Sequence, residues 1–141
     1  MLSYSILVSL YFYGDLLDPD VITDCLGVTP TKSFKLGDEH VTVLGGRVVR
    51  KTGLWALQSE TNSVQLSDHI EQLANNLIKI ANRKRVLAEL PNVDETYLDI
   101  FVCGGTDKDG GDAKFEISPR HLKIISELGA RVKFTACSVE Q

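Results

Sequence analysis

The sequence has little that points to export, membrane insertion or zinc binding. No basic residue precedes Lys32, so the apolar N-terminus lacks the positively charged segment of a secretory signal. No apolar run approaches the roughly 20 residues needed to span a bilayer. Cys25, Cys103 and Cys137 are far apart and form no C-x-x-C pair, which argues against a zinc knuckle or a thioredoxin-type motif. We therefore expect a cytoplasmic chain without membrane contact, whose cysteines are reduced, buried thiols.

Sequence signatures of catalysis and metal binding are also missing. The chain has no G-x-S-x-G motif, no P-loop and no H-E-x-x-H pair. His40, His69 and His121 are widely separated, whereas a metal site needs three or four ligands in tight geometry. In the acidic stretch 107–112 the glycines come too early for an EF-hand loop, and a polar turn is expected instead. The expectation is a protein that is not an enzyme and holds neither a cofactor nor a metal.

The composition is that of one globular domain. Of the 141 residues, 43% are hydrophobic and 24% are charged, which argues against disorder and for a single domain over residues 1–141. The net charge of −4 and the pI of about 5.3 disfavour nucleic acid as the partner, because binders of the phosphate backbone are usually basic.

Two hydrophobic periods organise the first half of the chain. Residues 4–13 alternate between two faces, which predicts a strand. Asp18-Pro19 supplies an N-cap and a proline suited to the first helical position, so a helix is expected over 19–26, ending at Gly27. The other predictions for this half are a loop over 28–40, a strand over 41–50 interrupted at Gly45-Gly46, and a strand over 54–60.

The second half opens with the longest predicted helix, capped by Ser67 or Asp68 and stopped before Pro91. Its apolar stripe comprises Ile70, Leu73, Leu77, Ile80 and Leu87. The cluster Arg83-Lys84-Arg85 suits the negative end of the helix dipole, with a phosphate-binding patch as the alternative. The remaining predictions are a strand over 97–103, a polar hairpin loop over 104–111, a strand over 113–117, a helix from Ser118-Pro119 to Gly129, and a strand over 131–138.

These elements predict an α+β domain in the order β-α-β-β-α-β-β-α-β. Strand pairs alternating with helices indicate a mixed or antiparallel sheet with helices packed on one face. Asp18-Pro19 before Gly27 parallels Ser118-Pro119 before Gly129, so the domain could consist of two related halves, although helix capping alone would produce the same pattern. The oligomeric state stays open, since free strand edges cannot be recognised from the sequence.

The order and spacing of several short motifs resemble a bacterial family of small proteins classed as a domain of unknown function. The motifs are Leu17-Asp18-Pro19, Ile22-Thr23, Leu26-Gly27, Thr29-Pro30-Thr31, Lys35, Gly37-Asp38, Lys51-Thr52-Gly53-Leu54-Trp55, His69-Ile70, Ile117-Ser118-Pro119, Leu122 and Leu128-Gly129. Two regions depart from the family pattern: Phe134-Thr135-Ala136-Cys137 replaces an acidic-aromatic ending, and residues 104–112 are particular to this chain. The resemblance implies no catalytic activity, and some family members lie in toxin–immunity gene neighbourhoods.

The first functional hypothesis is therefore a non-catalytic immunity protein that neutralises a bacterial toxin by covering a basic surface. Acidic side chains would steer the encounter and set its register. The candidate contact residues lie on the two loops that flank the strand predicted over 97–103, and they are Asp94, Glu95, Asp107, Asp109 and Asp112.

The second hypothesis is a small-ligand-binding or regulatory domain. The segment 30–55 mixes charged and aromatic residues around glycines, and its candidate site comprises Lys35, Asp38, Lys51 and Trp55. The competing structural interpretation places Trp55 in the core and leaves the charged side chains solvated.

Overall fold

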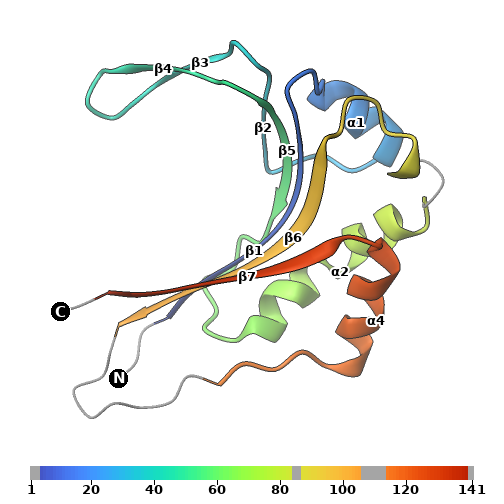
Figure 1. Ribbon diagram of the computed structural model, residues 1–141. Coiled ribbons are helices and arrows are strands. Elements are labelled where there is room, and N and C mark those ends of the chain that lie inside the picture. Colours follow the sequence, from blue (N-terminus) through green and yellow to red (C-terminus); the bar gives the residue numbers. More distant parts are fainter. Residues whose placement is uncertain (1–3, 84–86, 106–113, 140–141) are drawn as a thin grey trace.

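The computed structural model describes residues 4–83, 87–105 and 114–139, which build a five-stranded sheet, a separate two-stranded hairpin and helices on one face of the sheet (Figure 1). The large sheet has the order β2-β5-β1-β6-β7. Its strands are β1 (Tyr4–Gly14), β2 (Lys32–Phe34), β5 (Gly53–Gln58), β6 (Glu95–Gly105) and β7 (Arg131–Val139). The hairpin consists of β3 (Glu39–Val41) and β4 (Arg47–Val49), and the helices are α1 (Pro19–Leu26), α2 (Leu66–Ala81) and α4 (Pro119–Leu128).

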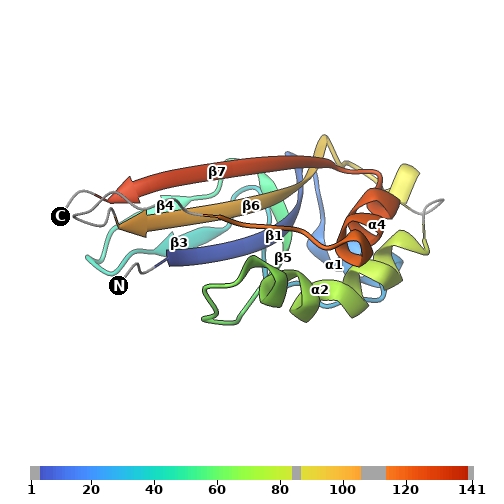
Figure 2. The ribbon, with the colours of Figure 1, turned by 90° about the horizontal axis from the view of Figure 1, so that it is seen from below.

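The sheet is mixed, as expected. β1 is its central strand and pairs antiparallel with both β5 and β6, whereas β6 and β7 are parallel because the chain crosses over through α4. The alternating residues of β1 that point towards the helices are buried, namely Ile6, Val8, Leu10 and Phe12. Turning the molecule shows that all three helices lie on this same side of the sheet (Figure 2). The α+β class and the one-sided helix layer are confirmed.

The two proline-initiated helices begin and end where the sequence predicts. The Asp18 side chain accepts a hydrogen bond from the backbone N–H of Asp20 at 3.0 Å, and the Ser118 hydroxyl accepts one from that of His121 at 3.2 Å. Gly27 and Gly129 both stop their helices at φ 68°, a left-handed conformation that costs glycine little. The two units connect differently, however: β7 returns beside β6, whereas β2 lies beside β5 and not beside β1. The two units thus share their helix caps but not their strand connections.

The long helix differs from the prediction at both ends. α2 begins at Leu66 with Gln65 as its N-cap, because the Asp68 carboxylate instead accepts a hydrogen bond from the Ser63 hydroxyl at 2.5 Å. It ends at Ala81, so Leu87 belongs to a later segment and not to the same stripe. The Arg83 guanidinium donates to the backbone carbonyl of Cys25 at 2.8 Å, and Lys84 and Arg85 lie outside the described residues.

Several predicted boundaries are wrong around the strands. The expected loop over 28–40 contains β2 and the beginning of β3. The strand expected over 41–50 is part of the β3–β4 hairpin, and of the bulge or turn expected at Gly45-Gly46 the structure has the turn. The strand predicted over 54–60 is β5, which spans Gly53–Gln58. The strand predicted over 97–103 is β6, which extends further at both ends, over Glu95–Gly105. Residues 114–117 form no strand, and residue 113 is outside the described part. Strands this short carry too few residues for a clear period.

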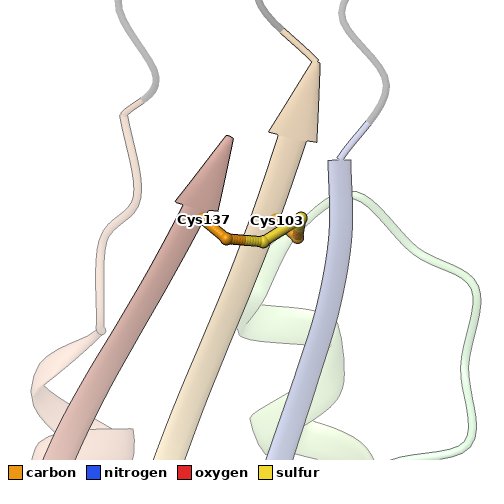
Figure 3. The surroundings of a disulfide bond; sticks show 2 residues. All are labelled: Cys103 and Cys137. Carbon is orange, nitrogen blue, oxygen red and sulfur yellow. A yellow bond between two sulfur atoms is a disulfide. The ribbon is translucent and has the colours of Figure 1, made fainter. Parts of the chain in front are cut away.

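The prediction that all three cysteines are reduced, buried thiols is wrong for two of them. Cys103 and Cys137 are direct neighbours in the parallel register of β6 and β7 and form a disulfide (Figure 3). Their Cα atoms are 4.6 Å apart although 34 residues separate them in the chain, so only the strand pairing brings them together. Cys25 is free and half-buried. Within residues 4–83, 87–105 and 114–139, no helix is long and apolar enough to cross a membrane.

Candidate functional site

The helices cover one face of the sheet and leave the other without a helical layer (Figure 2). Side chains alternate across a sheet, so the strand register assigns each residue to a face. We call the face turned away from the helices the open face. It carries Lys32, Phe34, Leu54, Ala56, Gln58, Leu7, Ser9, Tyr11, Tyr13, Glu95, Tyr97, Asp99, Phe101, Arg131, Lys133 and Thr135.

Three tyrosines form a cluster on the open face, near the end of β1 and the beginning of β6. Tyr11 and Tyr97 are direct partners across β1 and β6, and their ring centroids are 5.4 Å apart. The Tyr13 ring centroid lies 5.5 Å from that of Tyr11 and 6.0 Å from that of Tyr97. All three are half-buried, so their rings pack together without leaving the surface. Burial, followed by a hydrogen bond with Tyr97, raises the pKa of the Tyr13 phenol far above its ordinary value. The Tyr13 phenol therefore stays neutral, and the three rings together form an aromatic platform.

A network of charged groups adjoins the tyrosines on β6 and β7. The Lys133 ammonium lies 3.9 Å from the Tyr97 ring centroid and 3.0 Å from the Glu95 carboxylate, which Arg131 also contacts at 2.8 Å. The hydrogen bond from Lys133 and the two cationic charges lower the pKa of the Glu95 carboxyl. The Glu95 carboxylate is thus paired within the chain.

A second cation–aromatic contact lies on the open face at β2, the edge strand farthest from β7. The Arg50 guanidinium lies 4.2 Å from the Phe34 ring centroid, and the Lys32 ammonium lies 5.9 Å from it. Three cations and two carboxylates lie on the open face itself, so its net charge is +1 where the whole chain carries −4: Lys32, Arg131 and Lys133 against Glu95 and Asp99. The open face is more positive than the rest of the protein.

The β3–β4 hairpin projects from the body on the side of the sheet opposite the helices (Figure 1). Its tip turns at Gly45, whose φ of 84° favours glycine. Val43 and Leu44 at this tip are 104% and 97% exposed, and Val41 further back is 64% exposed. The hairpin therefore presents apolar side chains beside the open face without packing them on the core.

The structure does not gather the predicted acidic residues into one described patch. Asp94 and Glu95 lie where β6 begins, and the Asp94 carboxylate accepts a hydrogen bond from the Asp15 backbone N–H at 3.3 Å. Asp107, Asp109 and Asp112 lie outside the described residues. In the sequence they come after β6, the strand that Glu95 begins and that is about 33 Å long at the usual rise per residue.

The four residues of the alternative ligand site do not converge either. Trp55 is 0% exposed in the core, and its indole N–H donates to the Thr23 hydroxyl at 3.0 Å. Lys35 and Asp38 share one turn, in which the Asp38 carboxylate accepts from the Lys35 backbone N–H at 2.8 Å. Lys51 is exposed. A fully buried indole cannot line a surface pocket with these groups, which agrees with the structural interpretation of this segment.

The hydroxyl of Ser59 and the ring of His69 form a hydrogen-bonded serine–histidine pair, which is buried. The Ser59 hydroxyl lies 2.7 Å from His69 Nδ1 and also accepts the backbone N–H of Val8 at 3.0 Å. His69 Nε2 is 2.8 Å from the Ser63 carbonyl, so the ring donates there and accepts from Ser59. With exposures of 6% and 1%, Ser59 and His69 are shielded from solvent and join β1 to α2 through hydrogen bonds.

A second histidine joins the helices. His121 Nε2 in α4 lies 2.7 Å from the Glu71 carboxylate of α2, which Arg120 also contacts. These two partners lower the pKa of the Glu71 carboxyl, with the His121 hydrogen bond as the larger cause. Across the described part of the chain, no three His, Cys, Asp or Glu side chains converge in a way that could hold a metal ion.

Sequence reasoning missed the tyrosine cluster although its signal is present. In the strand pattern over 4–13, the second face carries Leu7, Tyr11 and Tyr13 instead of charged side chains. A strand with two apolar faces indicates either a second covering layer or an exposed aromatic surface. The register that places Tyr97 beside Tyr11 is not visible in the sequence.

Comparisons with known proteins leave the function open. A search of curated proteins found no match to this chain. A search of solved structures found none. The motifs assembled from the sequence predicted a family of unknown function, and that prediction is confirmed by a family model that matches residues 3–137. The chain belongs to the family described as a domain of unknown function, DUF4279.

Proposed function

We propose that this protein is a non-catalytic binding protein, an immunity protein that neutralises a bacterial toxin by covering its surface with the open face. The observation that carries the proposal is the cluster of Tyr11, Tyr13 and Tyr97 on a sheet face that no described helix covers. Tyrosine and arginine are enriched where proteins bind one another, because each combines a large contact area with a polar end.

Ion pairs within the chain change which acidic residues are expected to contact a toxin. Glu95 is paired with Arg131 and Lys133, so it has little attraction left for a basic partner. Asp94 has no cationic partner among the described residues and, with Asp107, Asp109 and Asp112, it remains the candidate for contact with a basic toxin surface. Aromatic packing would then supply most of the affinity and the acidic groups the rate of encounter.

The non-catalytic part of the proposal is supported by the location of the serine–histidine pair. Ser59 and His69 are buried and satisfy each other, and an enzyme needs a nucleophile or base that can reach its substrate. Hydrolytic activity that disappears in a Ser59→Ala variant would contradict this part of the proposal.

Residence in the cytoplasm is a further part of the proposal, and the disulfide provides its test. Disulfides are rare in the cytosol, where thiols are kept reduced. Cells should be quenched in acid and the free thiols of the protein counted by mass-tag alkylation. Three free thiols would agree with a cytosolic protein, whereas a protected Cys103–Cys137 pair would indicate an oxidising compartment.

Site-specific crosslinking tests the proposed binding face. A photoreactive phenylalanine replaces Tyr11 on the open face or, as the control, Leu122, which is 52% exposed on α4. We expect one protein to be captured from the native host through position 11 and not through position 122. Expressed alone, that protein should stop growth, and co-expression of this chain should restore it. Capture through both positions alike, or a harmless captured protein, would refute the proposal.

A small-ligand role is the second candidate, favoured by one cavity. The cavity has a volume of about 570 Å³, within the usual range for ligand sites, and its lining includes Phe12, Leu128 and Arg131. Phe12 contacts the sole tryptophan, Trp55, with ring centroids 5.3 Å apart. A ligand entering this cavity should therefore change the fluorescence of Trp55. A metabolite library that changes neither the fluorescence nor the Tm would argue against this function.

A further inference from the structure

The two edges of the large sheet differ in length. β2 forms one edge with three residues, and β7 forms the other with nine. No other described strand pairs with the outer side of β7, so a row of backbone N–H and C=O groups is left for a further strand.

β7 lacks the usual features that prevent edge pairing. Residues 131–139 contain no proline or glycine, and the register from Tyr97↔Arg131 to Gly105↔Val139 is continuous without a bulge. Its two charged residues, Arg131 and Lys133, are both paired with Glu95 on the open face. No charged residue follows Lys133 in the strand. The edge therefore offers little resistance to a second strand.

The helix-facing side of β7 is incompletely covered. Phe134 is paired in register with Ile100, which is 1% exposed, yet Phe134 itself is 69% exposed. Val132 on the same side is 37% exposed. The continuous parallel register with β6 holds all nine residues of β7 in place, so the edge is already ordered before any partner arrives.

We propose that β7 is a homodimer interface in which it pairs antiparallel with β7 of a second copy, with Phe134 on the two-fold axis. This register places the two Phe134 rings opposite each other, Lys133 opposite Thr135, and Arg131 opposite Cys137. Moving the axis to Lys133 would place that cation opposite itself, and moving it to Val132 would place Arg131 opposite Lys133. The charges thus disfavour an axis on the N-terminal side of Phe134, and the 69% exposure of the Phe134 side chain favours an axis at that residue. A self-complementary contact of this kind closes after two copies.

The dimer has a consequence for the open face. A two-fold axis through an antiparallel strand pair runs perpendicular to the sheet, so both helix layers stay on one side. The two open faces then join into one surface on the other side, with a tyrosine cluster in each half. This inference does not depend on the proposed immunity function, because a dimer can form whether or not that surface binds a toxin.

The oligomeric state of the full chain tests the interface. Sedimentation equilibrium should give twice the 15.6 kDa chain mass for the wild-type protein at high concentration. Phe134→Glu places two carboxylates on the axis, and like charges at an interface cost several kcal/mol, so the dimer Kd should rise on the order of 100-fold. Leu122→Glu on α4, where the side chain is 52% exposed, is the matched control and should remain a dimer. A monomeric wild type, or a Phe134→Glu variant that still dimerises, overturns the proposal.

Cysteine crosslinking tests the register and does not rely on loss of association. Directly opposite residues in an antiparallel pair lie within disulfide reach, so Phe134→Cys in a Cys25→Ser background should form a covalent dimer under mild oxidation. Val43→Cys on the hairpin tip, where the side chain is 104% exposed, is the control for random collision. Equal crosslinking at both positions, or none at 134, contradicts the two-fold at Phe134.

Discussion

The two faces of the central strand differ in chemistry although they share one backbone. On the helix side, Val8, Leu10 and Phe12 are at most 1% exposed, and the side chains are apolar. On the open side, Tyr11 and Tyr13 are half-buried and carry hydroxyl groups. A helix layer requires side chains without polar ends, whereas an uncovered sheet face keeps groups that can bond both to aromatic neighbours and to water. We infer that stability resides mainly on the first face and binding on the second.

The largest loss of stability is expected from a large-to-small substitution in the core between the sheet and the helices. Trp55→Ala removes a fully buried ring that packs on Phe12, and such deletions usually cost about 3–5 kcal/mol. Tyr11→Ala, on the other face, should cost clearly less because half-buried rings lose less contact. Urea unfolding of both variants measures the difference. Equal losses would mean that the open face is a second core.

The second-largest loss of stability is expected from removing the disulfide, which lies on the open face of β6 and β7. Replacing both Cys103 and Cys137 by serine releases a crosslink between residues 34 apart, and the chain-entropy model gives a loss of about 3–4 kcal/mol. The free energy of unfolding should be compared with that of Cys25→Ser, which carries the control substitution at a free cysteine. Similar stabilities of the two variants would show that the crosslink contributes nothing.

A smaller loss is expected from the buried polar pair on the helix side. His69→Ala leaves the Ser59 hydroxyl without its 2.7 Å partner, and an unsatisfied buried group costs about 1–3 kcal/mol. The double variant with Ser59→Ala should then lose less than the sum of the two single variants, because they share one bond. Additive losses in a double-mutant cycle would contradict this coupling.

The smallest effect should be that of pH on the open face. Lys133 and Arg131 lower the folded-state pKa of Glu95, so this carboxylate stabilises the fold above the ordinary pKa of 4.5. That contribution is lost as the pH falls below 4.5 towards the lowered pKa, because the unfolded chain then binds the proton first. Glu95→Gln should therefore weaken the acid dependence of unfolding, with Asp94→Asn as the control. An unchanged pH profile would mean that the network leaves stability unaffected.

The candidate site was harder to predict than the fold. Caps and prolines are local signals, and they located α1 and α4 because a helix end depends on a few consecutive residues. β2, β3 and β4 have three residues each, too few for a period, and β2 and the beginning of β3 lie where a loop was expected. Glu95 was chosen as a free carboxylate, but the cations that pair with it come from β7, 36 and 38 residues later.

The sequence by itself determined the alternation of β1 and the ends of the two proline-initiated helices, since these depend on residues within a few positions of one another. It also determined the α+β class and the family, because the order and spacing of elements and motifs along the chain can be read without knowing which strands pair. Only the tertiary structure decided which face of the sheet stays uncovered, that Tyr97 joins Tyr11 and Tyr13, that Cys103 meets Cys137, and that β7 ends the sheet. Each of these depends on strand register across long stretches of chain, and register is set by the packing of the whole domain.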